Sequence, residues 1–138
     1  MDIKRRVRNL VRKYKTNCPF ELAGYLNINV RFKSLPDSYR GFYFRARTRR
    51  FIVINDKISE EWQRFVCAHE LGHDRLHRGL LGYYFIEQHT LFNPGKYERQ
   101  ANLFAVHLMT AFSEIEEHET LECFYARNGV PQEMVGKF

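Results

Sequence analysis

The motif H-E-x-x-H, which places His69 and His73 four residues apart, is the feature that most constrains how this chain folds. It lies in a stretch predicted to be a long helix of about residues 60–78, because Ser59 is a favourable N-cap and Gly79 a favourable C′ residue. On such a helix the two imidazoles project from one face, about 40° apart around the axis. The fold must therefore either pack two histidines in a core or use them to bind a metal ion.

The glutamate inside the motif favours the metal. Two imidazole nitrogens at this spacing can bind one zinc ion at about 2.0–2.1 Å. Glu70 lies about 100° from His69 and about 60° from His73 around the helix, so it can reach a water molecule at the metal without binding the metal itself. There it would be the catalytic group, which takes the proton of the water and passes it to the leaving amine.

A catalytic zinc site also needs a third protein ligand and an open fourth position. His77 does not fit, because eight residues of helix place it about 12 Å along the axis from His69. It is predicted instead to be a core or supporting residue. The longer pattern H-E-x-x-H-x-x-G-x-x-H is absent, since Leu76 stands at the position of its glycine.

Glu98 is the best candidate for the third ligand. It follows a Pro-Gly turn in the first turn of a predicted helix of about residues 96–109, and a glutamate from a neighbouring helix completes a His2Glu set. Asn102 shares its helix face and could hydrogen-bond the second nitrogen of a ligand imidazole. Without a metal, Glu98 would be a solvated acid favoured by the helix dipole.

The rest of the chain predicts an α+β fold, a single domain spanning residues 1–138. Apolar periodicity, turn residues and capping residues indicate the other elements. They are a helix at 3–14, a short helix from Pro19, a strand at 28–32, a hairpin of 41–46 and 49–55, a helix after a Ser113–Glu116 capping box that ends near 127–129, and a last short helix from Pro131. Residues 82–92 fit either a loop or a short strand.

Composition limits the classes of protein to consider. No apolar run approaches the roughly 20 residues that a membrane span needs, and charges interrupt the N-terminal segment where a signal peptide would be apolar. The three cysteines are Cys18, Cys67 and Cys123, which are odd in number and include no C-x-x-C pair. We therefore expect a protein of the reducing cytoplasm, without disulfides and without a membrane partner.

The net charge of +6 is unevenly distributed. Residues 1–57 hold 15 Lys and Arg against 4 Asp and Glu, and residues 58–138 hold 7 against 12, so the first part is net +11 and the second net −5. The basic part could steer the protein toward an acidic or nucleic-acid-bound partner, or it could serve solubility alone. Direct DNA binding is possible but not favoured.

Several stretches resemble the ImmA/IrrE family of metallo-endopeptidases. They are "ISEEWQRFVCAHELGHDRLH" and "YERQANLFAVHLM", with "NCPFELAGYLNINV" and "GFYFRARTRRFIVIN" similar to compact members from phages and mobile elements. The resemblance covers about residues 17–110. One departure is Thr110, where many relatives have proline.

The resemblance implies a minimal zincin-like (gluzincin-like) domain, with a small three-stranded, partly antiparallel sheet packed on the H-E-x-x-H helix and on further helices. It implies one catalytic Zn2+ ion held by His69, His73 and Glu98, with Glu70 as the catalytic acid. Asn102 and His77 would support the ligands. The strand at 51–55 would be an edge strand that pairs with the substrate.

The compact members of the family are anti-repressors. The resemblance therefore implies a protease of the bacterial host cytoplasm that cleaves a helix-turn-helix repressor and relieves repression of phage or mobile-element genes. A non-catalytic regulator of the same fold, which binds a repressor or DNA through its basic N-terminal half, is the alternative. A structural zinc site is disfavoured because it would need a fourth ligand.

The sequence leaves other points open, namely the cleaved bond, the activating signal, the oligomeric state and the group that stabilises the oxyanion. Candidates for that group are Tyr83, Tyr84, Tyr97 and His89.

Overall fold

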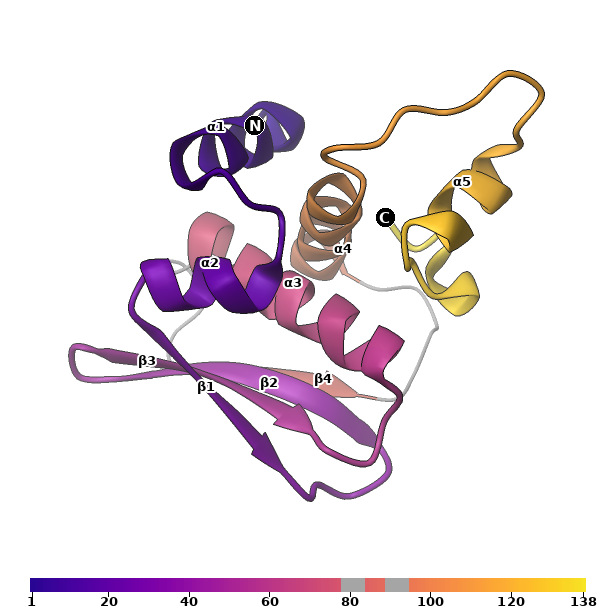
Figure 1. The fold of residues 1–138 in the computed structure, drawn as a ribbon. Helices are drawn as coiled ribbons and strands as arrows, with labels where there is room; N and C mark the ends of the chain where they lie inside the picture. The colour runs from indigo at the N-terminus through magenta and orange to yellow at the C-terminus, as the bar shows by residue number, and fades with distance from the viewer. Residues whose placement is uncertain (78–83, 89–94) are drawn as a thin grey trace.

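The computed structural model describes residues 1–77, the strand 84–88 and residues 95–138, with the helices gathered on one face of a twisted sheet (Figure 1). The helices are α1 (Ile3–Tyr14), α2 (Pro19–Tyr25), α3 (Glu60–His77), α4 (Lys96–Met109) and α5 (Leu121–Arg127), followed by a short 3-10 turn at Gln132–Met134. The strands are β1 (Ile28–Lys33), β2 (Tyr39–Ala46), β3 (Arg49–Asn55) and β4 (Tyr84–Gln88). The predicted α+β class is confirmed.

The sheet has the order β1-β3-β2-β4. β1 runs parallel to β3, whereas β2 is antiparallel to both β3 and β4. The three predicted strands are present, and β4 lies in the segment that the sequence left open between loop and strand. The sheet is therefore mixed, with four strands.

This strand order corrects the expectation for residues 51–55. They lie in β3, which is hydrogen-bonded on both sides, with Val30 opposite Ile52 on one side and Tyr43 opposite Ile52 on the other. An interior strand has no main-chain groups left to pair with a substrate. Among the described strands, the edges of the sheet are β1 and β4, so a peptide that adds to the sheet must pair with one of these.

α3 packs on the sheet and forms the centre of the core. Ile52 and Ile54 of β3 and Phe65 and Leu71 of α3 are at most 2% exposed. Above α3 lies α4, and the two helices approach closely at Gly72. A Cβ atom added there would lie only 3.1 Å from the Cβ atom of Phe104.

A buried carboxylate fixes how α3 lies on the sheet. Asp74, 1% exposed, accepts a hydrogen bond of 2.6 Å from the hydroxyl of Tyr43 in β2. Arg50 of β3 donates to both of its oxygens at 3.1 and 3.0 Å, and Arg75 donates at 3.0 Å. Moving α3 would leave the buried carboxylate of Asp74 without these partners, which costs free energy. The network therefore holds one face of α3 against β2 and β3.

Local capping explains where the first and third helices begin. The carboxylate of Asp2 accepts a hydrogen bond from the backbone N–H of Arg5 at 3.0 Å, and α1 then buries Ile3, Val7 and Val11. For α3, the hydroxyl of Ser59 accepts from the backbone N–H of Trp62 at 3.2 Å, as predicted for an N-cap. The predicted C′ residue, Gly79, lies outside the described residues.

The predicted capping box at Ser113 and Glu116 is wrong. The hydroxyl of Ser113 donates to the side chain of Asn128 at 2.5 Å, and α5 begins only at Leu121. Its N-cap is Thr120, whose hydroxyl accepts from the backbone N–H of Cys123 at 3.2 Å. The helix ends near residues 127–129, as expected. Thr110, the departure from the family pattern, is the C-cap of α4.

No helix within the described ranges is both long enough and apolar enough to cross a membrane.

Gly41 gives a test of how closely α3 is seated on the sheet. A Cβ atom at this position of β2 would lie 2.5 Å from the carbonyl oxygen of Val53 and 2.8 Å from Cγ1 of Val66. We expect Gly41→Ala to lower the free energy of unfolding by about 3 kcal/mol, because a backbone atom cannot move aside as a side chain can. Urea denaturation measures this change.

Gly24 is the matched control, since a Cβ atom there would meet nothing within 4 Å and the residue lies within helix α2. We expect Gly24→Ala to raise the free energy of unfolding by about 0.5–1 kcal/mol. Equal effects of the two substitutions would show that the close approach at Gly41 is absent.

Candidate metal centre

Two helices bring the three predicted ligands together. His69 and His73 project from α3, and Glu98 lies in the first turn of α4. The Nε2 atom of His69 is 3.1 Å from Oε2 of Glu98, and the Nε2 atom of His73 is 3.0 Å from Oε1 of the same carboxylate. The two histidines are at most 2% exposed, and the glutamate side chain is 33% exposed. The site thus opens to solvent on the side of Glu98.

These three residues fit a metal ion. Ligand atoms at about 2.0–2.1 Å from a tetrahedral zinc ion lie about 3.3 Å from one another, which is close to the observed distances between the imidazole and carboxylate atoms. Two neutral imidazole nitrogens and one carboxylate are also the donor types of catalytic zinc sites. The residues present could therefore hold one ion and leave one position open.

Glu70 offers a second carboxylate beside the two histidines. Ligand atoms of His69, Glu70 and His73 lie within 4.8 Å of one another, so this group could also hold a metal by distance alone. Glu98 approaches both Nε2 atoms more closely, at 3.0 and 3.1 Å. By these distances Glu98 remains the stronger candidate for the ligand position. Glu70, which is 0% exposed, lies beside the site as a second acidic group.

Asn102 orients the first histidine. Its Oδ1 atom lies 2.7 Å from Nδ1 of His69, and its Nδ2 group donates to the backbone carbonyl of Lys137 at 2.8 Å. With the amide in this orientation, Nδ1 of His69 carries the proton and donates it to Asn102. Nε2 then keeps its lone pair, which is the form that a metal ligand needs.

His77 has the corresponding position beside the second histidine. Its Nδ1 atom lies 2.9 Å from Nδ1 of His73, and its Nε2 atom lies 2.8 Å from Oε1 of Gln100. If His77 donates to Gln100, its Nδ1 atom accepts the proton of His73, and Nε2 of His73 again keeps its lone pair. The structure thus places His77 next to a ligand and not among the ligands.

The sequence did not single out Gln100. It lies two residues after Glu98 on α4, and its amide reaches across to His77 of α3. An uncharged glutamine on a predicted helix carries no signal of such a contact. Gln100 does share a helix turn with Glu98. This proximity predicts a contact with His77 only once the packing of α3 on α4 is known.

Burial and hydrogen bonding set the charges of the site. Burial lowers the pKa of His73 to about 4, although the neighbouring carboxylate of Glu98 opposes this shift. Burial also lowers the pKa of His77. For Glu98, burial alone would raise the pKa, but the imidazole groups of His69 and His73, within 3.1 Å of its carboxylate, outweigh burial and the pKa lies well below its usual value. At neutral pH His73 is therefore neutral and Glu98 is a carboxylate, the protonation states that bind a metal cation.

Of the four residues predicted as candidates for stabilising the oxyanion, Tyr97 is the one whose side chain is described. Tyr83, His89 and the side chain of Tyr84 lie outside the described residues. Tyr97 is described, and its ring packs against the ring of His77 with 4.8 Å between the ring centroids. It therefore lies beside the supporting histidine.

Comparison with known proteins finds a family model and two similar sequences. Residues 23–133 match the peptidase M78 family model, described as the IrrE N-terminal-like domain. The chain is 40% identical over 136 residues to an uncharacterized immunity region protein 2 of Bacillus phage phi105, with 96% of this chain and 85% of the phage protein covered. It is 28% identical over 116 residues to the metallopeptidase ImmA of Bacillus subtilis (strain 168), with 83% and 67% covered.

The assignment of Glu98 can be tested by metal analysis. We expect Glu98→Ala to lower the zinc affinity by roughly 100-fold or more, because the substitution removes a ligand and also the negative charge that offsets the cation. Zinc content after dialysis, measured by mass spectrometry, gives the occupancy. Glu133→Ala, an exposed glutamate on the C-terminal 3-10 turn, is the control and should keep full occupancy. Full occupancy of Glu98→Ala would assign the third ligand elsewhere.

The role of Asn102 makes a finer prediction. Asn102→Ala should weaken zinc binding about 10- to 100-fold, because His69 loses the acceptor that fixes its tautomer and ring orientation. Asn17→Ala is a matched control, since Asn17 also donates to a backbone carbonyl, that of Leu108, at 3.2 Å. Competition with a zinc indicator dye measures both affinities. Equal affinities of the two variants would mean that Asn102 has only a structural role.

Proposed function

The chain belongs to the peptidase M78 family, the IrrE N-terminal-like domain, and we propose on this basis that it is a zinc-dependent endopeptidase that cleaves a helix-turn-helix transcriptional repressor. The observation that carries the proposal is the convergence of two imidazole Nε2 atoms on the carboxylate of Glu98, within 3.1 Å, with Glu70 adjacent. We further propose that residues 1–138 act as one metalloprotease domain.

His69, His73 and Glu98 would hold the zinc ion, while Asn102 and His77 would fix the tautomers of the two histidines. When bound, the ion supplies Lewis acidity, which activates both a water molecule and the carbonyl group of the substrate.

Glu70 would move the protons. Its carboxylate takes a proton from the attacking water as the water oxygen bonds to the carbonyl carbon of the scissile peptide. The carboxylic acid that results gives this proton to the peptide nitrogen as the C–N bond breaks, so that the amine leaves as a neutral group. Glu70 is 0% exposed and its side chain is held within a helix, so it is positioned before the substrate arrives.

The name of the phage relative supports the proposed partner. That protein is called an immunity region protein of a phage, a name that agrees with a partner that controls phage genes. We propose that the chain acts in the cytoplasm of a bacterial host. There it would cleave the repressor and so relieve repression of phage or mobile-element genes.

The second candidate is a non-catalytic regulator of the same fold that binds a repressor or DNA. The observation that favours it is the exposed basic face of α1, which carries Lys4, Arg8, Arg12 and Lys15. Binding without cleavage would relieve repression just as well. A variant that keeps the metal but loses proton transfer separates the two functions.

Glu70→Gln is that variant, because glutamine has the same shape but cannot take a proton. We expect the variant to keep one zinc ion per chain and its thermal stability, while repressor cleavage falls roughly 10²- to 10⁴-fold. Purified repressor from the neighbouring gene, incubated with the protein and resolved by mass spectrometry, gives the rate and the cleaved bond.

Glu61→Gln, in the first turn of the same helix, is the control and should cleave at the wild-type rate. If Glu70→Gln relieves repression in cells as well as the wild type does, the regulator is correct and the enzyme is not.

A further inference from the structure

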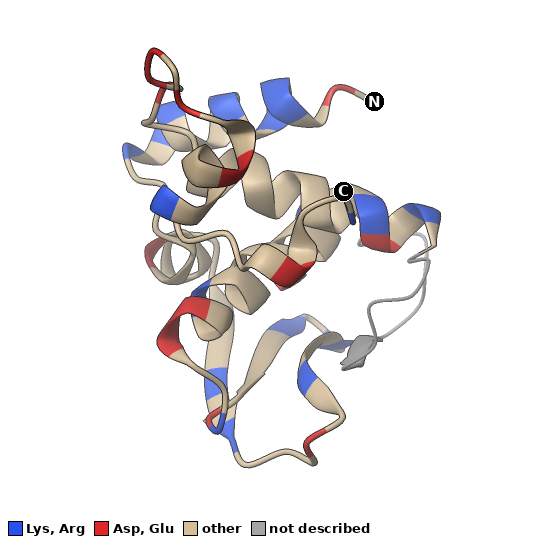
Figure 2. Cartoon of the chain, turned by 90° about the vertical axis from the view of Figure 1, so that its right-hand side faces the viewer, with Lys and Arg blue, Asp and Glu red and all other residues tan. Residues whose placement is uncertain are grey.

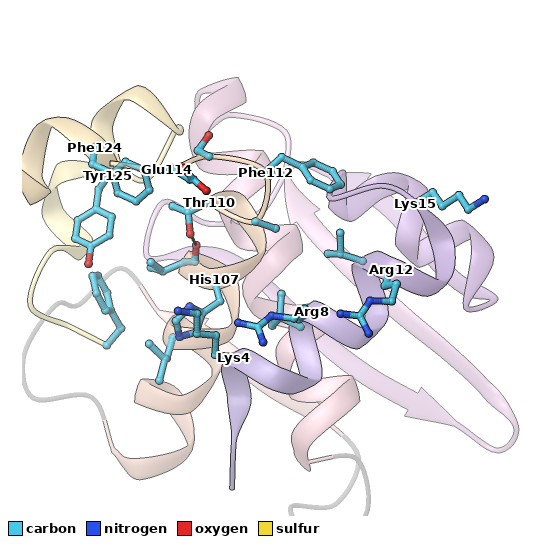
Figure 3. Close-up of a pocket in the computed structure, with 17 residues that line it drawn as sticks. Lys4, Arg8, Arg12, Lys15, His107, Thr110, Phe112, Glu114, Phe124 and Tyr125 are labelled. Carbon is cyan, nitrogen blue, oxygen red and sulfur yellow. Dashed lines mark hydrogen bonds between the residues drawn. The ribbon is translucent and has the colours of Figure 1, made fainter. Parts of the chain in front are cut away.

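A groove lies on the face of α4 that is turned away from the metal centre. α1, α4, the segment 110–114, α5 and the C-terminal Phe138 line it, and it encloses about 1260 Å³ (Figure 3). Leu103, Val106 and His107 of α4 face this groove, whereas Glu98 and Asn102 of the same helix contact the ligand histidines. The groove is therefore a separate surface of the molecule.

One wall of the groove is basic. Lys4, Arg8 and Arg12 follow one another along α1 at helical spacing, Lys15 is the C-cap residue of the helix, and all four are exposed. In the described part of the chain, no ion pair involves any of them. Four cations without partners along one wall attract a ligand that carries several negative charges.

The floor and the opposite wall are largely apolar, and Thr110, Ser113 and Glu114 are the polar residues of the segment 110–114 that lines the groove. Val7, Val11 and Val106 form part of the floor, and Phe112 remains 66% exposed at its edge. α5, which supplies Phe124 and Tyr125, has no buried side chain. An apolar floor beside a basic wall favours a protein ligand over duplex DNA. The phosphates of DNA would neutralise the cations, but DNA has no apolar side chains that could cover the floor.

The same chain carries a segment with the complementary chemistry. Residues 114–122 contain five glutamates and two exposed apolar side chains, Ile115 at 48% and Leu121 at 59%. Glu119 is held by Arg127 at 2.8 and 2.9 Å, so the other four glutamates project from the surface. In Figure 2 the acidic positions of the loop that leads into α5 lie at the same end of the molecule as the basic positions of α1.

We propose that this groove binds residues 115–122 of a second copy of the chain, the part of the acidic segment that does not itself line the groove. The two patches have opposite charge and lie next to each other, so two molecules related by a two-fold axis bring each groove against the acidic segment of the other. Both contacts are then equivalent, and each buries apolar side chains within a ring of ion pairs. The proposal concerns a different face from the metal centre and does not depend on peptidase activity.

Analytical ultracentrifugation of the full-length protein, loaded with zinc, tests the proposal. We expect a concentration-dependent dimer in 0.1 M salt, with dissociation that increases as salt is added. Arg8→Glu combined with Arg12→Glu should weaken dimerisation at least tenfold. The matched control is Arg5→Glu with Arg6→Glu, which makes the same change in net charge on the same helix outside the groove and should change the dissociation constant less than twofold.

A charge exchange tests the pairing itself. Glu116→Arg with Glu117→Arg should also weaken the homodimer. Mixed with the Arg8→Glu, Arg12→Glu protein, this variant should form a heterodimer of nearly wild-type affinity, because both contacts then join opposite charges. Phe112→Ala should weaken the dimer, whereas Phe32→Ala, another exposed phenylalanine but outside the groove, should not.

The proposal is overturned if the wild-type protein is monomeric at millimolar concentration. It is also overturned if both arginine pairs have equal effects, or if the mixed variants fail to associate while each remains folded by circular dichroism. Binding of a duplex DNA oligonucleotide that depends on Arg8 and Arg12, in a protein that stays monomeric, would assign the groove to nucleic acid.

Discussion

The close packing of α3 on α4 is the contact on which the candidate site depends. Gly72 lets the two helices approach closely, because a Cβ atom at this position would lie 3.1 Å from Cβ and 3.2 Å from the ring of Phe104, tighter than ordinary contact. At this distance the carboxylate of Glu98 reaches the Nε2 atoms of His69 and His73. A separation larger by about one ångström would leave three unrelated polar side chains and no site for a metal ion.

Hydrogen bonds around the site offset the free-energy cost of burying its polar groups. Two buried imidazoles and a carboxylate lose hydration, and each imidazole regains a bond through its second nitrogen, one with Asn102 and one with His77. Asp74 performs a different task, since it binds α3 to β2 and β3 on the opposite side. The helix is thus held from both faces, which leaves the Nε2 atoms little freedom to move.

The C-terminal segment connects the two surfaces of the molecule. Lys137 accepts the second hydrogen bond of Asn102, and Phe138 beside it lines the groove and packs against Tyr125 with 5.4 Å between the ring centroids. The position of His69 therefore depends in part on residues that are distant from it in sequence.

Periodicity and capping were sufficient to predict the helices at 3–14 and 96–109, the hairpin and the motif residues, because these depend on contacts within a few residues. They failed for the start of α5, where the side chain of Ser113 bonds Asn128 instead of a helix N-terminus. They also failed for residues 51–55, since strand order depends on which segments pair. The donor types and their spacing on each helix were thus determined by the sequence alone. Whether Glu98 meets the motif and whether Gln100 reaches His77 were decided only by the packing of α3 on α4, because that distance is set by contacts between residues far apart in the chain.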